Sequence, residues 1–228
     1  MKKLINYFTK FEIVLWSGSV MLIVSSFIIF DRENFLTLLA SIIGVTSLIF
    51  CAKGNPFGQL LMIFFSVIYG IISYSCAYYG EMITYLGMSG PMALFALIVW
   101  LRNPVKGNKS QVKVNQISKK ETVFMLALSV VVTIVFYFIL KFFGTASLIP
   151  STFSITTSFI AVYLTFRRSP YFAFVYAIND LVLIILWVIA TIKEINYVSV
   201  LICFIVFFIN DIYGFISWLK MEKIQKDM

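Results

Sequence analysis

The chain has 228 residues, of which 61% are hydrophobic and 12% are charged, and its formal net charge is +8. A soluble domain of this length could not bury so much apolar surface, so the composition excludes a water-soluble protein and predicts an integral membrane protein. The apolar runs are too long for the strands of a membrane barrel, which alternate over about 10 residues, so the spans are expected to be α-helices.

Eight apolar segments follow one another along the chain, and each is close to the ~20 residues that a helix needs to cross a bilayer. Lys2, Lys3 and Lys10 precede the first segment, but no small-residue cleavage site follows it, so this segment is predicted to be a span and not a cleaved signal peptide. The eight predicted helices are 12–30, 35–52, 57–79, 83–101, 121–143, 148–166, 171–192 and 197–219.

Basic residues fall unequally on the two sides that eight spans create. One side receives 15 of the 18 Lys and Arg residues, and the other receives Arg32, Lys141 and Lys193. Because cytoplasmic loops are enriched in Lys and Arg, the protein is predicted to lie in the cytoplasmic membrane with both termini in the cytoplasm. The basic loop 102–120 lacks the interleaved aromatic residues of a nucleic-acid site, so it is interpreted as a solvated linker near anionic lipid.

Two landmarks recur along the chain. Lys53–Phe57 and Arg167–Tyr171 share the order basic, any residue, small polar, proline, aromatic, and they lie 114 residues apart. Trp100 and Trp218 each precede a leucine and a basic residue, 118 residues apart. The offsets predict two parallel three-helix units in one membrane domain, because a single helix lies between them. The predicted order is an extra helix (12–30), a first unit (35–101), a loop and linker helix (102–143) and a second unit (148–219).

Two Asn-Asp pairs lie deep inside apolar segments: Asn179-Asp180 and Asn210-Asp211. Ionisable groups at such depth are costly and usually mark a site. In a regular helix three sets of residues would each share one face, and these faces are expected to point inward around a pocket. Whether Asp211 faces this pocket or a neighbouring helix stays open. The sets are Tyr176, Asn179, Asp180, Leu183 and Trp187; Asn210, Tyr213, Gly214 and Ser217; and Gln59, Met62, Ser66, Tyr69, Gly70 and Ser73.

Each polar residue also has a purely structural interpretation, because Asn, Ser and Tyr often only join neighbouring helices by hydrogen bonds. The three cysteines, Cys51, Cys76 and Cys203, are interpreted as small apolar residues in helix packing. Trp100 and Trp218 are expected to anchor helix ends at the membrane interface. Pro91 is expected to kink its helix, as prolines often do beside a cavity.

The chain contains no histidine, and no Lys or Arg lies near the middle of a span. The missing histidine removes the commonest metal ligand and general base, so neither a metal ion, a cofactor nor an enzymatic activity is expected. A site for a phosphorylated or carboxylated substrate would be expected to offer a buried cation. The carboxyl groups therefore favour a cationic or neutral ligand.

Two stretches resemble known sequences. The first, Tyr78–Met82 followed by Pro91-Met92 and Trp100, and the second, Asn210–Phe215 with Trp218, resemble the two halves of the PnuC family of vitamin transporters. The resemblance implies a helix arrangement like that of SWEET sugar transporters and facilitated uptake of nicotinamide riboside. A separate cytoplasmic kinase would trap the vitamin by phosphorylation. It also implies a possible homotrimer.

One departure leaves the vitamin open. Many members of the family open the seventh of these helices with several tryptophans near the substrate, whereas this chain has Tyr171, Phe172, Phe174 and Tyr176. Thiamine is therefore a second candidate substrate. A membrane sensor or scaffold that does not transport is a further alternative. The residues predicted to bind substrate are Gln59, Tyr69, Tyr176, Asn179, Asp180, Trp187, Asn210 and Tyr213.

Overall fold

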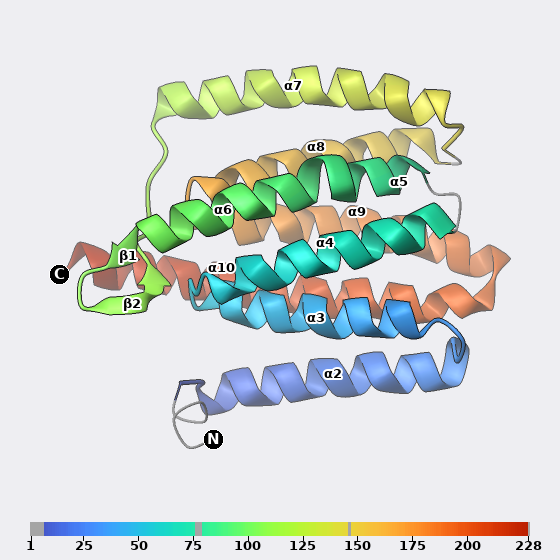
Figure 1. Ribbon diagram of the computed structural model, residues 1–228, viewed down its shortest axis with the longest axis horizontal. Coiled ribbons are helices and arrows are strands. Elements are labelled where there is room, and N and C mark those ends of the chain that lie inside the picture. The colour runs from blue at the N-terminus through green and yellow to red at the C-terminus, as the bar shows by residue number, and fades with distance from the viewer. Residues whose placement is uncertain (1–6, 76–78, 146, 228) are drawn as a thin grey trace.

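The structure, a computed structural model, describes residues 7–75, 79–145 and 147–227. Within this part of the chain, eight helical segments are long and apolar enough to cross a membrane, which confirms the predicted all-α membrane class. They lie side by side along the long axis of the molecule (Figure 1). Cys76 and Tyr78, which the sequence singled out, lie outside the described residues.

Six of the spans are simple helices, and their ends agree closely with the predicted ones. They are α2 (Lys10–Phe30), α3 (Phe35–Ala52), α4 (Phe57–Ser75), α7 (Lys119–Phe142), α8 (Leu148–Phe166) and α9 (Phe172–Lys193). The last span begins with the short 3₁₀ helix η2 (Ile195–Tyr197) and continues as α10 (Val198–Lys226), which runs beyond the predicted end at residue 219.

The fourth span is interrupted near its middle. It consists of α5 (Tyr79–Thr84), the π-helical turn η1 (Tyr85–Ser89) and α6 (Gly90–Arg102). The amide of Gly90 donates to the carbonyl of Tyr85, five residues back, immediately before Pro91. Proline cannot donate a hydrogen bond and clashes with the carbonyl four residues before it, so the wider turn accommodates the ring. At the place where the sequence predicts a kink, the structure therefore has a π-helical turn immediately before Pro91.

Two outer helices flank a centre of six spans (Figure 1). Helix α2 packs on α3 and α10 at one side, and α7 packs chiefly on α8 at the opposite side. The central spans are α3, α4, α5–α6, α8, α9 and α10. Only 22% of the apolar window of α2 and 17% of that of α7 are buried inside the bundle, so both outer helices leave most of their surface for contact with lipid.

The loops after α3 and α8 have the same backbone geometry. Gly54 and Arg168 both adopt a left-handed conformation, with φ of 65° and 60°. In each loop two amides bond back to carbonyls in the last turn of the preceding helix, which ends the helix with its carbonyls satisfied. These bonds run from Gly54 to Cys51 (2.9 Å) and Asn55 to Phe50 (3.0 Å), and from Arg168 to Thr165 (3.0 Å) and Ser169 to Leu164 (3.0 Å).

The loop between α6 and α7 differs from the expected solvated linker. It folds into a small antiparallel hairpin of β1 (Pro104–Val105) and β2 (Asn108–Val112) at the end of the bundle where α10 finishes (Figure 1). Val105 and Val112 are buried, whereas Asn108 at the start of β2 is exposed. The basic residues of the loop lie on the exposed surface of this hairpin. Its two valines are buried, and Val112 packs in a core cluster of the bundle.

Substitution at the two left-handed positions should change stability by different amounts. Gly54→Ala should lower the free energy of unfolding by about 1–2 kcal/mol, because a Cβ is disfavoured in the left-handed region. Arg168→Gly should change it by about 0.5 kcal/mol or less, since relief of the same strain offsets the added freedom of the unfolded chain. Reversible chemical unfolding in detergent micelles measures both values; equal losses at the two sites would contradict this account.

Candidate functional site

A cavity of about 670 Å³ lies among the six central spans. This volume is within the range of small-molecule sites, which run from about 300 to 1,000 Å³. All six spans contribute side chains, and the turn after α7 contributes at one end. The cavity therefore lies where two groups of helices meet: α3, α4 and α5–α6 on one side and α8, α9 and α10 on the other.

The two ends of the cavity differ. One end is lined by exposed residues of the turns after α7 and α9, including Gly144, Lys193 and Glu194. The other end stops at the buried side chains of Cys51, Gln59 and Phe172. The cavity is therefore open at the end with few basic residues and closed at the end that carries the hairpin.

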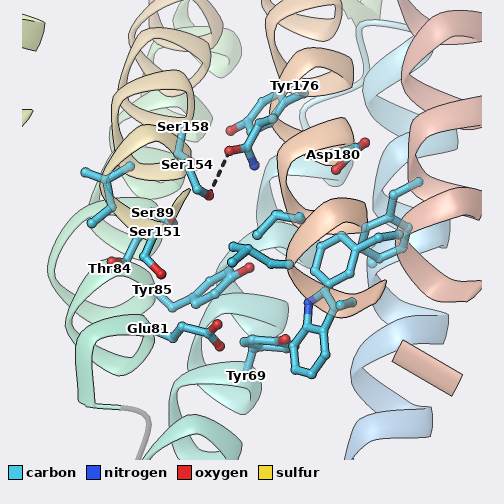
Figure 2. Close-up of a pocket in the computed structure, with 18 of the residues that line it drawn as sticks. Tyr69, Glu81, Thr84, Tyr85, Ser89, Ser151, Ser154, Ser158, Tyr176 and Asp180 are labelled. Atoms are coloured by element: carbon cyan, nitrogen blue, oxygen red, sulfur yellow. Dashed lines mark hydrogen bonds between the residues drawn. The ribbon is translucent and has the colours of Figure 1, made fainter. Parts of the chain in front are cut away.

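Helix α9 supplies the polar wall of the cavity. Tyr176, Asn179, Asp180, Leu183 and Trp187 all line it, as their spacing predicts. The amide of Asn179 is oriented from α8: its Oδ1 accepts hydrogen bonds from the hydroxyls of Ser154 (3.0 Å; dashed in Figure 2) and Thr157 (2.7 Å). Because both donors occupy the oxygen, Nδ2 is the part of this amide that is available to a ligand.

Besides Glu194 at the open end, three carboxyl groups of the described residues line the cavity: Glu81, Asp180 and Asp211. Asp180 and Asp211 are both 5% exposed and share a side-chain hydrogen bond between α9 and α10. Asp180 Oδ2 has no hydrogen-bond partner among the described residues. Two carboxyl groups that share a hydrogen bond hold one proton between them, so this pair carries at most one negative charge. The question of which way Asp211 points is thus answered: it faces the cavity.

Glu81 was not among the predicted site residues. The predicted span began at residue 83, which placed this glutamate in a loop, whereas α5 begins at Tyr79 and carries Glu81 along the cavity wall. The signal was present in the sequence as a single acidic residue next to an apolar segment. Such a residue is more often a helix-end charge, and only the neighbouring helices show that it points inward (Figure 2).

Aromatic rings cover the wall opposite the hydroxyls of α8. The rings of Tyr69 and Tyr85 lie 4.5 Å apart between centroids, close to Glu81 in Figure 2. Trp187 packs against Tyr197 at 5.4 Å. Rings beside carboxyl groups suit a flat ligand with a positive charge, because the ring faces attract cations.

Asn210 and Tyr213 do not line the cavity, in contrast to the prediction that their face points inward. Asn210 Nδ2 donates to Ser19 Oγ at 3.0 Å, and the hydroxyl of Tyr213 donates to Glu12 Oε1 at 2.9 Å. Both acceptors belong to the outer helix α2. Helix α10 packs between α2 and α9 and carries polar side chains toward both neighbours. Sequence spacing alone therefore cannot tell which of its polar faces meets the cavity.

Trp100 and Trp218 do not lie at the membrane interface, and the prediction that they are anchors there is wrong. Both side chains are 0% exposed. Their ring centroids lie 5.3 Å apart, and each indole N–H donates to a backbone carbonyl, that of Thr165 for Trp100 (2.9 Å) and that of Cys51 for Trp218 (2.8 Å). The end of α6 packs here against the middle part of α10 in one buried cluster, so the two tryptophans meet each other instead of lipid.

Comparison with known proteins identifies the family. Residues 34–220 match the family described as nicotinamide mononucleotide transporter, which is most of the chain. The chain belongs to this family. It is a family of membrane transporters, so the protein is a multi-pass transporter and not an enzyme. Among the predicted site residues, six of eight line the cavity of this transporter: Gln59, Tyr69, Tyr176, Asn179, Asp180 and Trp187.

Two proteins illustrate the likeness. The nicotinamide riboside transporter PnuC of Neisseria mucosa is 24% identical over 226 residues, which cover 97% of this chain and 86% of that protein. The crystal structure of the vitamin B3 transporter PnuC superposes with a TM-score of 0.81 at 24% identity and covers 95% of this chain and 93% of that one. The fold of this transporter is therefore PnuC-like.

The contact between Tyr213 and Glu12 should be structural. Tyr213→Phe should lower the free energy of unfolding by about 1.5–3 kcal/mol, because the carboxylate loses a hydrogen-bond donor in a buried place. In a Glu12→Ala background the same substitution should cost much less, since the two residues act on each other. Tyr137→Phe on α7 is the matched control and should change stability by about 0.5 kcal/mol or less. Equal losses in both backgrounds would contradict the pairing.

Proposed function

We propose that the protein carries nicotinamide riboside into the cell by facilitated diffusion with alternating access, and that cytoplasmic phosphorylation traps the vitamin. The observation that carries this proposal is the composition of the cavity, which combines a pair of carboxyl groups and several aromatic rings. The name of the relative from Neisseria mucosa supports the choice of substrate. Because the proposed trapping step would retain the vitamin, no ion coupling is required.

The charge of the carboxyl pair suits a singly charged cation. The Asp180–Asp211 pair carries at most one negative charge, and the pyridinium ring of nicotinamide riboside carries one positive charge. Among the described residues, the basic side chain that lines the cavity is Lys193, at its exposed mouth. A phosphate deeper in the cavity would meet carboxylates and no cation, so the riboside suits the site better than the mononucleotide of the family description.

The remaining lining residues would stack on the ligand and orient it by hydrogen bonds. Tyr69, Tyr85 and Trp187 would stack on the flat ring. Asn179 Nδ2 would donate to an oxygen of the ribose or carboxamide, because its own oxygen is held by two hydroxyls. Gln59 lies at the closed end, where its amide donates to Cys51 Sγ at 3.3 Å. Tyr176 and Asp180 of α9 also line the cavity (Figure 2).

The proposed transport cycle requires two units that move against each other, and we propose that these are residues 35–101 and 148–219. The identical backbone turns at Gly54 and Arg168, 114 residues apart, support a parallel duplication. The outer helices support it further. Thr9 and Ser118 cap α2 and α7, each bonded to the amide of a glutamate three residues on, and these glutamates pair with Lys53 and Arg167. Helices α2 and α7 are thus counterparts.

The end of the bundle that carries the hairpin is proposed to face the cytoplasm. The termini of α2 and α10 that bear Lys10 and Lys226 lie at this end, together with the loops that carry Lys53 and Arg167 (Figure 1). Arg32, Lys141 and Lys193 lie at the opposite end. By the charge asymmetry of membrane proteins the cavity then opens outward, toward the incoming vitamin.

Thiamine is a second candidate substrate, because it also pairs a flat ring with a single positive charge. The same carboxyl pair and the same rings would serve it. Riboflavin is neutral and would make less use of Asp180 and Asp211. Competition between unlabelled nicotinamide riboside and thiamine in one binding assay would rank the two.

Uptake of radiolabelled nicotinamide riboside into vesicles that contain the purified protein tests the proposal. The expected result is uptake above that of empty vesicles until the inner and outer concentrations are equal, because no ion gradient drives it. Accumulation beyond this point would contradict facilitated diffusion. Uptake no greater than in empty vesicles would contradict the proposed function itself.

The role of the carboxyl pair can be tested with the charge of the ligand. Asp180→Asn together with Asp211→Asn should weaken binding of nicotinamide riboside at least tenfold, or ~1.4 kcal/mol, because either single variant leaves the other carboxyl group to carry the one negative charge of the pair. The dihydro form of the ligand, which has nearly the same shape and an uncharged ring, should lose little. Tyr213→Phe is the control, since Tyr213 points to α2, and it should leave both dissociation constants unchanged in a calorimetric titration. An equal loss for both ligands would mean that the carboxyl pair only joins helices.

A further inference from the structure

We propose that Trp100 and Trp218 form the gate at the closed end of the cavity, and that residues 103–118 are a strap that holds this gate shut. The inference rests on the proposed transport function. Its observations are separate from those of the substrate site, because neither tryptophan lines the cavity. Two features carry it: hydrogen bonds exchanged between the two proposed units, and a covering segment bonded to both of them.

The two tryptophans exchange hydrogen bonds across the units. Trp100 ends the last helix of the first unit and donates to the carbonyl of Thr165 in α8, in the second unit. Trp218 lies in α10, the last helix of the second unit, and donates to the carbonyl of Cys51 in α3, in the first unit. The two acceptors are 114 residues apart, the same offset as the loops that follow them. Each unit therefore holds the other by an equivalent bond.

The rings also block the path. Both indoles are fully buried, and Phe172, which lines the closed end of the cavity, packs edge-on against Trp218 at 4.9 Å and against Trp100 at 6.2 Å. Cys51 is part of both the cavity and the proposed gate, because its side chain lines the cavity and its carbonyl accepts a hydrogen bond from Trp218. A ligand that leaves through this end must separate the rings.

The two acceptor carbonyls lower the free-energy cost of separating the tryptophans. Cys51 O also accepts from the amide of Gly54 (2.9 Å), and Thr165 O also accepts from the amide of Arg168 (3.0 Å). When an indole withdraws, its acceptor keeps one hydrogen-bond donor and is not left unpaired. Hydrogen bonds of this kind can break and re-form in each transport cycle. A buried carbonyl that had the indole as its only donor would be left unpaired on opening, and this would oppose the movement.

The strap binds the loops of both units. The amide of Val112 donates to Gly54 O at 2.9 Å in the first unit. Asn115 donates twice to the second unit, from its backbone amide to Arg168 O and from Nδ2 to Arg167 O, both at 3.0 Å. Val112 is fully buried in the same cluster as the two tryptophans. The units can separate at this end only when the strap releases one of the loops.

The gate can be tested with tryptophan-to-phenylalanine variants, which keep an aromatic ring and remove the N–H donor. Trp100→Phe and Trp218→Phe should favour the state that is open to the cytoplasm. Cys51 reports this state, since it lies between cavity and gate. A membrane-impermeant methanethiosulfonate is added to the cytoplasmic side of inside-out vesicles, and the modified cysteine is identified by mass spectrometry of its peptide. Modification of Cys51 should be about fivefold faster than in the unmodified protein, as expected for one lost hydrogen bond.

Matched controls separate gating from general loosening. Trp16→Phe removes an indole bond of the same kind, to Thr46 Oγ1 at 3.1 Å between α2 and α3, and should leave the rate unchanged. Asn115→Ala releases the strap from the second unit and should accelerate modification without touching either tryptophan. Asn108→Ala, at the exposed start of β2, should have no effect.

The outcomes distinguish the gate from the transport function. Cys51 modification that is no faster in Trp218→Phe and Asn115→Ala than in Trp16→Phe and Asn108→Ala would overturn the gate. If the unmodified protein in the same vesicles still takes up nicotinamide riboside, the proposed function stands without this gate. Absence of uptake by the unmodified protein would overturn the function, and with it the assignment of these residues to a transport path.

Discussion

Polar groups in the hydrocarbon of a bilayer have no water to bond, and this constraint organises the whole bundle. Polar side chains inside the spans must meet one another or a cavity. Helix α10 shows both solutions one residue apart: Asn210 bonds to Ser19 on the outer helix, and Asp211 shares a hydrogen bond with Asp180 at the cavity. The helix is thereby fixed in rotation, because turning it would expose one of these groups to lipid.

The same constraint explains how the outer helix α2 is held. Glu12 is buried and accepts hydrogen bonds from Lys53 and Tyr213, which belong to the first and second of the proposed units. Its counterpart Glu121 on α7 bonds to Arg167 and Tyr163, both in the second unit. The outer helices are therefore equivalent in their capping and first ion pair but not in what they join. Helix α2 connects the units, whereas α7 follows only one of them.

The proposed substrate site and the proposed gate use different chemistry, as their different tasks require. The cavity carries carboxyl groups and an oriented amide, which would discriminate a ligand by charge and by hydrogen bonds. The closed end carries large rings and hydrogen bonds to carbonyls that have a second donor. Binding needs fixed groups that recognise one molecule, and gating needs contacts that can be lost at small cost. Cys51 and Phe172 lie where the two regions meet.

The sequence alone determined the membrane class, the eight spans and the shared face on α9, because hydropathy and helical periodicity are local properties. It also pointed to Asn179 and Asp180, since polar groups at such depth are costly wherever they lie. Tertiary structure decided which of two polar faces of α10 meets the cavity, brought Glu81 into its wall, and turned Trp100 and Trp218 from expected interface anchors into a buried pair. These outcomes depend on which helices are neighbours, and residues more than 100 positions apart in sequence make those contacts.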